Sequence, residues 1–464
     1  MQIAKWTHSS IRCGLSAPKG LMSCVPIYVL ILKKIRPLRF KIMCVDTDRN
    51  KSERTAWMAE GDLQAARPSV FYLLAVFSFL FFAPLEGLYA QYSVLRALSW
   101  LCLFASVFLL LCFYIVHSAR GEGKRLDVVF FLVALICLIF GSFTLVNEGS
   151  LFQYMKKVAF ILGPWLYLTV FGRYGFKPVL KAMLIGSLII IGANFITMLI
   201  MYPHGGFRPE YGDTWLFGQR TYMRNFIFLA LCLCLFYDRV RHRRFSVLTL
   251  AVVVVSLATL ILGDAMTSLV VMVFLLAVLV LSGCGLKCSI ILRPIVVVSV
   301  ALDVLLVHLR QIALFGDFIV GVLDRNLTLS YRTQAWDVAM EEIGTNPLVG
   351  TGFRDLEESG ITVGFGRQLS NAHNEVLDVC YKGGLLGALS FFALVAVCCL
   401  PLLRKSGYWA AFILGAFLGG FFIEALVSDI WYPQFFFLLY FAAYLKHWAP
   451  LLEETKRQTP QREA

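Results

Sequence analysis

The stretch NAHNEVLDVCYKGGLLG, residues 371–387, joins a polar opening that contains one histidine to an apolar run of the kind that crosses membranes. Gly383 follows His373 after nine intervening residues. Histidine titrates near neutral pH and can therefore accept or donate a proton under working conditions. If a helix begins after Ala372, His373 lies in its first turn, where unpaired backbone N–H groups and the helix dipole favour anions and disfavour the imidazolium. A neutral histidine there suits a general base acting on a phosphate-linked substrate. The alternative is a histidine that only hydrogen-bonds at a membrane–water boundary.

The composition of the chain indicates a membrane protein. Of its 464 residues 59% are hydrophobic and only 15% are charged, and the mean hydropathy is +0.75. Repeated apolar runs predict an all-α polytopic integral membrane protein, because lipid offers backbone groups no hydrogen-bond partners. The formal net charge of +13 lies in short basic clusters between these runs, which indicates membrane topology and argues against nucleic acid as a partner. The 13 cysteines include no CxxC pair, which argues against a disulfide framework or a zinc site.

Twelve membrane spans are expected. They cover residues 69–88, 93–117, 126–146, 156–172, 178–201, 215–237, 245–263, 266–282, 289–308, 383–402, 408–427 and 430–447. Residues 1–67 are expected to form a cytoplasmic, poorly ordered extension, because its apolar run Val25–Leu32 is too short to cross a bilayer. Met43 and Met58 are alternative starts of the chain.

Alternate turns between the expected spans are rich in Lys and Arg, which places those turns and both termini in the cytoplasm. The basic residues of these turns are Arg120, Lys124, Arg125, Arg173, Lys177, Arg239, Arg241, Arg243, Arg244, Lys287, Arg404 and Lys405. The chain then divides into spans 1–9 over residues 68–308, a periplasmic loop over 309–382, spans 10–12 over 383–448 and a cytoplasmic tail over 449–464.

The long external loop contains a second expected helix, over Tyr331–Ile343, with Ser330 as its N-cap. Its apolar face is formed by Trp336, Ala339, Met340 and Ile343. An amphipathic helix of this kind is expected to lie on the membrane surface. The residues that end it before the His373 segment are Pro347, Gly350 and Gly352.

Three arginines are candidate ligands of a pyrophosphate. Arg220 and Arg224 lie one helical turn apart in the outer half of the sixth span, and Arg332 shares a helix face with Trp336. Guanidinium groups hold phosphate oxygens in bidentate fashion, so the three suit the neutralisation of a pyrophosphate leaving group without a divalent metal. The alternatives are snorkelling of Arg220 and Arg224 to lipid headgroups and an interfacial anchor at Arg332.

Other polar residues are weaker candidates. Asp264 and Ser268, with Asn374 beside the histidine, are candidates to line the same cavity. The loop aspartates Asp317, Asp324, Asp337 and Asp355 are scattered, so neither a metal nor another cofactor is expected. His204 and His308 also face the external side, but neither has a partner pattern like that of His373.

Three segments of the chain resemble one known family. SYRTQAWDVA (residues 330–339), NPLVGTGF (346–353) and AHN followed by GGLLG (within 372–387) are similar to the O-antigen ligase and polymerase superfamily, and closest to the ligase. The spacing of His373 and Gly383 and the twelve-span layout with a large loop between spans 9 and 10 also resemble the ligase. The chain differs from the family pattern in two places, since Ser268-Leu269 stands where the family often has Ser-Arg and the motif around Arg220 is loose.

The resemblance implies a GT-C-like fold and an inverting, metal-independent glycosyltransferase of lipopolysaccharide assembly in the bacterial inner membrane. Such an enzyme moves a glycan from undecaprenyl pyrophosphate onto a sugar hydroxyl of the lipid A core at the periplasmic face. By the resemblance, His373 would deprotonate or orient the acceptor hydroxyl. Arg332 and one or both of Arg220 and Arg224 would hold the pyrophosphate.

Three other functions stay open. A polysaccharide polymerase uses the same donor with a second lipid-linked glycan as acceptor, although the short external segment Tyr202–Trp215 argues against it. A protein O-oligosaccharyltransferase differs only in its acceptor. A lipid-linked glycan transporter needs no catalytic histidine and is expected to carry charges at the membrane midplane.

Overall fold

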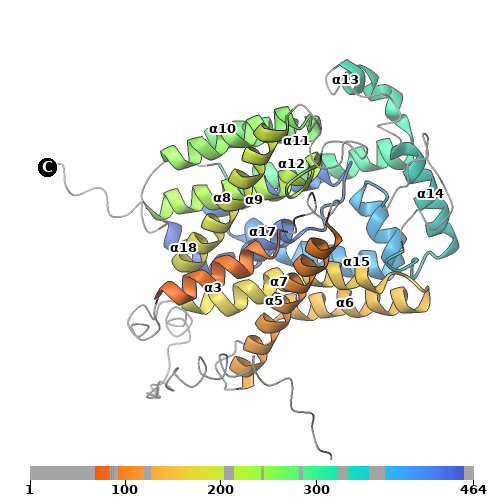
Figure 1. Ribbon diagram of the computed structural model, residues 1–464. Helices are drawn as coiled ribbons and strands as arrows, with labels where there is room; N and C mark the ends of the chain where they lie inside the picture. The colour runs from red at the N-terminus through yellow and green to blue at the C-terminus, as the bar shows by residue number, and fades with distance from the viewer. Residues whose placement is uncertain are drawn as a thin grey trace, which may run out of the picture.

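The computed structural model describes residues 68–83, 85, 87, 92–119, 127–202, 214–241, 245–281, 286–321, 332–354 and 371–453. The described chain is a bundle of helices with one two-stranded hairpin (Figure 1). The expected extension over residues 1–67 lies outside the described residues. The expectation of a helical, polytopic membrane protein is confirmed.

Each of the twelve expected spans overlaps a helix. These helices are α3 (Pro68–Leu80), α5 (Ser93–Ala119), α6 (Val128–Val146), α7 (Leu151–Phe171), α8 (Phe176–Met201), α9 (Met223–Val240), α10 (Val247–Leu262), α11 (Met266–Leu281), α12 (Cys288–Asp303), α15 (Glu375–Arg404), α16 (Trp409–Glu424) and α17 (Pro433–Ala443). The shorter elements are η1 (Gly172–Tyr174), η3 (Arg220–Tyr222), the π-helical turn η5 (Val304–His308), η6 (Gln311–Phe315), α13 (Gly316–Gly321), α14 (Arg332–Thr345) and α18 (Leu445–Glu453).

Among the described helices, five are long and apolar enough to cross a membrane by themselves. They are α5, α6, α8, α12 with η5, and α15. The pair α17 and α18 gives a sixth if its 83° bend is counted as one broken span. The count of twelve spans therefore stays a prediction, whereas the polytopic character is confirmed by these helices.

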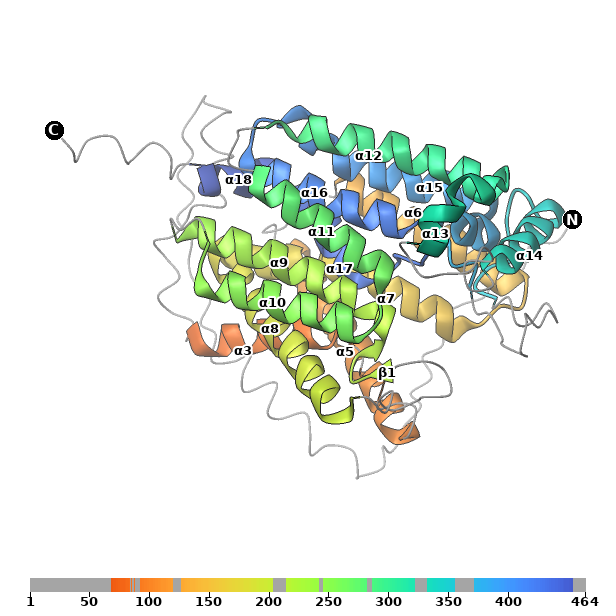
Figure 2. The same cartoon turned by 90° about the horizontal axis from the view of Figure 1, so that it is seen from above.

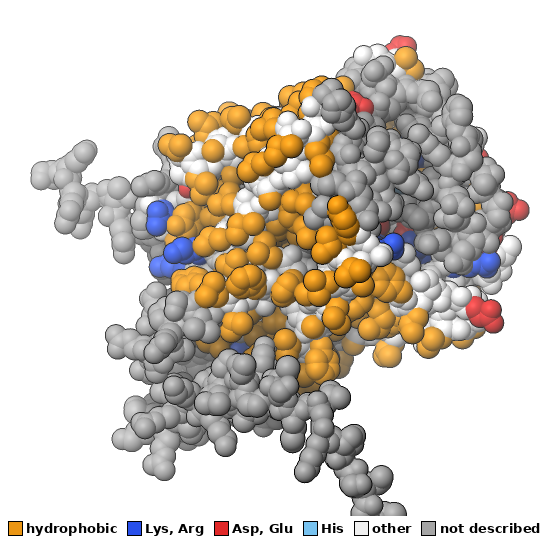
Figure 3. All heavy atoms as spheres, viewed as in Figure 1, with side chains coloured by type: hydrophobic (Ala, Val, Ile, Leu, Met, Phe, Trp, Pro, Cys, Tyr) orange, Lys and Arg blue, Asp and Glu red, His pale blue; other side chains and the backbone are white. Residues whose placement is uncertain are grey.

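Apolar side chains form a band around the bundle. In Figure 3 orange side chains cover the middle of the molecule, with Lys and Arg at its left edge and charges of both signs toward its right. Val94 and Leu138 are exposed on this surface by 76% and 69%. Exposure of so many large apolar side chains is what a lipid environment requires of a helical bundle.

The two ends of the band differ. Figure 2 places α13 and α14 at one end of the bundle and α18 at the other. The expected topology, with the long loop and the C-terminal tail on opposite faces of the membrane, stays a prediction.

The centre of the bundle is α17. Its residues Phe435 to Tyr440 are fully buried, and the Tyr440 hydroxyl donates to the carbonyl of Ile161 on α7 at 2.9 Å. Aromatic side chains of this size contribute most to packing where hydrophobicity alone does not drive helices together in lipid.

The tenth expected span, residues 383–402, lies within α15. This helix begins at Glu375, because the Asn374 side chain accepts from the backbone N–H of Leu377 at 2.9 Å and caps the helix there. Inside α15, Gly384 has φ 56° and ψ −160°, so the helix is broken at the glycine pair.

The break in α15 is filled by the segment that contains NPLVGTGF. The N–H of Leu385 donates to the carbonyl of Pro347 at 2.9 Å, and the N–H groups of Thr351 and Gly352 donate to the carbonyls of Tyr381 and Lys382 at 2.8 and 2.9 Å. The broken helix thus exchanges its internal hydrogen bonds for bonds to the loop. Two of the three segments that carry the family resemblance therefore form one interlocked unit.

The helix α14 confirms the expected loop helix but corrects its placement. Trp336 and Ala339 are fully buried and pack with Leu377 and Tyr381 of α15 and Val307 of η5. The apolar face therefore docks on the bundle and does not lie on the membrane surface. The expected N-cap Ser330 lies outside the described residues.

A short hairpin departs from the expected all-α fold. The strand β1 (Thr214–Trp215) pairs antiparallel with β2 (Gly218–Gln219) just before η3. Gly218 has φ 126°, a conformation that favours glycine at the turn.

Candidate functional site

His373 lies at the end of the bundle where α14 packs on α15. The sequence placed it in the first helical turn, and this is corrected, because Asn374 is the N-cap and His373 precedes it. Its backbone has φ 49°, and its N–H donates to the side-chain oxygen of Asn371 at 3.0 Å. A non-glycine residue rarely adopts this left-handed backbone conformation, and here a local hydrogen bond holds it.

Asn374 holds the entry to α15 in place. Its side-chain nitrogen donates to Asp303 at 2.7 Å and to the carbonyl of Leu426 at 3.1 Å. Its side-chain oxygen accepts from the N–H of Leu377, so both the nitrogen and the oxygen of the Asn374 amide are bonded. Asn374 therefore positions His373 through the backbone.

Electrostatics keep His373 neutral. Burial, together with the positive charges of Arg332, Arg224 and Lys382, lowers its pKa from 6.5 to about 4, although Asp429 acts in the opposite direction. The imidazole is therefore unprotonated at neutral pH, as the sequence argument expected. The same interactions place Arg332 and Arg224 in its electrostatic surroundings.

Arg332 is the first residue of α14, and its side chain is half-buried. The helix that carries it is fixed by Trp336, over whose ring Arg310 stacks at 5.4 Å. Arg310 also pairs with Asp337. Arg332 thus begins a docked helix and acts electrostatically on His373.

Arg224 is buried and committed to the protein. Its guanidinium donates to Ser428 at 2.7 Å, to the carbonyl of Asp429 at 3.1 Å and to the carbonyl of Thr221 at 2.8 Å. It also pairs with Glu424 at 3.6 Å. It holds the turn between α16 and α17 from the side of α9. Arg220 begins η3, and its side chain lies outside the described part of the structure.

Two charged residues of the site were missed by the sequence argument. Lys157 on α7 pairs with Asp429 at 2.7 Å and also donates to the carbonyl of Trp431 at 3.3 Å. Burial raises the pKa of Asp429, but Lys157 and Lys382 outweigh burial and hold that pKa below its ordinary value. A lysine inside an apolar helix was the available signal, because such a charge is costly unless it is paired.

Helix α15 also holds the turn that carries Asp429, in addition to α7 and α9. Glu375 accepts from the N–H of Ile430 at 2.8 Å and its own N–H donates to the carbonyl of Ala425 at 2.9 Å. Lys382 pairs with Asp378 at 2.5 Å and lies 5.7 Å from the ring of Phe353. The ionised carboxylate near His373 is therefore fixed by α7, α9 and α15 together.

The other two candidates sit at the start of α11. Ser268 is buried, and Asp264 is half-buried with φ 48° in the preceding turn. Their role as cavity residues stays a prediction. Among the described residues, no group of three or more His, Cys, Asp and Glu side chains is arranged to hold a metal ion.

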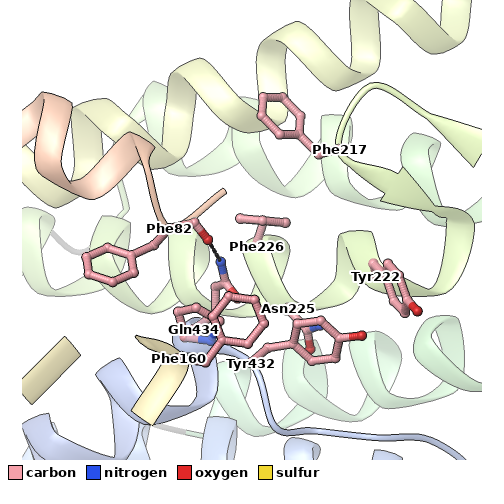
Figure 4. A pocket seen from close by; sticks show the side chains of 9 residues that line it. Phe82, Phe160, Phe217, Tyr222, Asn225, Phe226, Tyr432 and Gln434 are labelled. Atoms are coloured by element: carbon pink, nitrogen blue, oxygen red, sulfur yellow. Dashed lines mark hydrogen bonds between the residues drawn. The ribbon is translucent and has the colours of Figure 1, made fainter. Parts of the chain in front are cut away.

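A small cavity lies on the other side of the α16–α17 turn (Figure 4). Its walls are aromatic and include Phe160, Phe226 and Tyr432. Asn225 and Gln434 reach it with amide atoms that have no hydrogen-bond partner among the described residues. Tyr432 also lies 5.3 Å from the ammonium of Lys157, so the cavity borders the charged pair.

Comparison with known families gives one match. Residues 216–392 match the sequence model of the family described as O-antigen ligase. The matched range contains Arg224, Arg332, His373 and the glycine break of α15, but neither Lys157 nor Asp429. A comparison with curated proteins finds no match.

Proposed function

We propose that this chain, which belongs to the O-antigen ligase family through residues 216–392, transfers a glycan from undecaprenyl pyrophosphate to a sugar hydroxyl of the lipid A core. The proposal places the protein in the bacterial inner membrane, with both termini cytoplasmic and His373 at the periplasmic face. One observation carries it. A histidine kept neutral by burial and by neighbouring cations lies at one end of a membrane bundle, with an arginine on a docked helix beside it.

The proposed reaction is a direct displacement at the anomeric carbon of the donor. The acceptor hydroxyl oxygen forms a bond to that carbon while the bond from carbon to the pyrophosphate oxygen breaks. The hydroxyl proton goes to the neutral imidazole of His373, and the pyrophosphate leaves on its carrier lipid with the bonding electron pair. The anomeric configuration inverts in a single displacement.

Arg332 supports the leaving group in this scheme. A guanidinium group stabilises charge that develops on phosphate oxygens as the bond breaks. Arg224 adds positive potential while it holds the α16–α17 turn, and Arg220 is a further proposed contact to the pyrophosphate. Because arginines neutralise this charge, the proposed reaction needs no divalent metal.

Binding of the donor would also change the pKa of His373, the proposed general base. In the free protein the neighbouring cations disfavour a protonated His373. A bound pyrophosphate brings negative charge to the same place and reverses that effect, since an opposite charge nearby favours the imidazolium. The base would therefore become stronger when the donor is in place.

A deletion strain tests the proposal. Lipopolysaccharide from that strain is run on a gel beside its extracted undecaprenyl-linked glycans. The ligase assignment requires loss of the whole glycan ladder from the lipid A core and accumulation of long polymer on the carrier lipid. A single repeat still joined to core would mean a polymerase, and an unchanged ladder would mean another acceptor, such as a protein.

A further inference from the structure

A groove opens between α5 and α7 on the flank of the bundle. Its walls include Arg96, Ala97, Trp100 and Phe104 of α5 and Phe152 of α7, and its free volume is about 380 Å³. Trp100 and Phe152 meet edge to face at 5.5 Å and form its floor. The groove is thus an apolar trough on a surface that faces lipid.

Two cations stand at this trough. Arg96 is exposed on its wall, and the ammonium of Lys156 lies 5.1 Å from the ring of Trp100. An apolar, aromatic floor beside two positive charges suits a lipid that carries negative charge on its headgroup. A neutral lipid would use only the apolar floor, and a free sugar would use only the polar groups.

The groove is one helix away from the candidate site. Lys156 lies against the ring of Trp100 in the groove wall, whereas the next residue, Lys157, pairs with Asp429, whose charge acts on His373. The beginning of α7 is tied to the loop at the site, since the N–H of Ser150 donates to the carbonyl of Phe353 at 2.9 Å. A lipid in the groove would therefore hold its headgroup at the same end of the bundle as His373.

We propose that this groove docks the acceptor, an acylated glycolipid with phosphate groups on its sugars. The choice of acceptor over donor rests on the proposed function. Arg332, the proposed donor contact, lies on α14, and Figures 1 and 2 show α14 and α5 on different sides of the bundle. An inverting displacement requires the attacking hydroxyl to approach opposite to the leaving group, so the two lipids should enter from different sides.

The test fills the groove. Ala97→Trp places a large side chain in the trough, and Arg96→Glu reverses one of its charges. Ala105→Trp is the matched control, because Ala105 is exposed on the same helix and does not line the groove. Binding of purified core lipopolysaccharide without O-antigen to the full-length protein in nanodiscs is measured without donor, with phosphatidylglycerol as competitor. The KM values for acceptor and donor are then measured separately.

We expect both groove variants to weaken acceptor binding and raise its KM at least tenfold, with the donor KM and the control unchanged. A rise in the donor KM alone would overturn the proposal and assign the groove to the donor lipid. Equal loss of acceptor and phosphatidylglycerol binding, or no loss of either, would also overturn it, because the groove would then hold ordinary membrane lipid only. Because binding is read without turnover, failure of the glycosyl transfer itself would be seen as a separate result.

Discussion

Lys157 and Asp429 are 272 residues apart in the chain, yet their side chains meet at 2.7 Å inside the bundle. The pair joins α7 to the turn before α17 and leaves each side chain at most 10% exposed. Its carboxylate also acts electrostatically on His373 and opposes the cations that lower the pKa of that histidine. The pair therefore connects the packing of the bundle with the chemistry of the site.

Removing one partner of this pair should destabilise the protein strongly. Lys157→Met leaves Asp429 as a buried charge without its ammonium, at a cost of about 3–5 kcal/mol. The double variant Lys157→Met/Asp429→Leu should recover a large part of that loss, because no buried charge is left unpaired. Thermal unfolding in detergent measures both. If the double variant is less stable than either single one, the pair is not the coupled unit described here.

The pH dependence of turnover should differ between free and donor-bound protein. The free protein holds the pKa of His373 at about 4, so kcat/KM for the donor should stay flat as pH falls to about 5 and decrease only below that. The acid limb of kcat should lie at higher pH, because the bound pyrophosphate raises the pKa of the same group. Coincident acid limbs would contradict activation of the base by the donor.

Arg332→Lys should raise the KM for the donor by about 10- to 100-fold, since the ammonium keeps the charge but loses the bidentate contact. Arg310→Lys is a control, because it keeps a charge beside Trp336 without touching the proposed contact. Steady-state kinetics at saturating acceptor separates KM from kcat. An unchanged donor KM in Arg332→Lys would remove Arg332 from the pyrophosphate site.

Gly384→Ala should unfold the interlock between α15 and the loop. Its backbone conformation is one that side chains rarely adopt, and a Cβ there would lie 2.4 Å from the carbonyl group of Leu348. The cost is on the order of 1–3 kcal/mol or more. Gly192→Ala is the control, since a Cβ at Gly192 meets nothing within 4 Å. Equal melting temperatures for the two variants would contradict the need for the break.

Much of the fold follows from local patterns in the sequence. Apolar runs and basic turns predict the helices, and the polar start of the stretch at residue 371 predicts a helix entry near His373. These features depend on residues close together in the chain. The side chain of Asn374 caps α15, and this helix begins eight residues before the expected span. Hydropathy does not show that start, because a cap depends on one hydrogen bond.

The rest depends on contacts between distant segments. Nothing near Trp336 indicates that its face docks on Tyr381 of α15 and not on lipid, since both surfaces are apolar. Asp429, which pairs with Lys157, and Ser428, which accepts from Arg224, lie more than 200 residues away. Hydropathy therefore marks these charges as costly but does not show what pairs with them. Residue chemistry singled out His373 and Arg332, the resemblance gave them roles, and the structure added the carboxylate of Asp429, which pairs with Lys157 of α7.

The most direct test of the central claim is glycan transfer by the purified protein. Undecaprenyl-pyrophosphate-linked glycan and core lipopolysaccharide are incubated with the wild type, with His373→Gln and with His117→Gln, all in the presence of a metal chelator. The account predicts transfer by the wild type and by His117→Gln, and a loss of about 10²- to 10⁴-fold in kcat for His373→Gln with unchanged donor binding. Transfer by His373→Gln at the wild-type rate would contradict it.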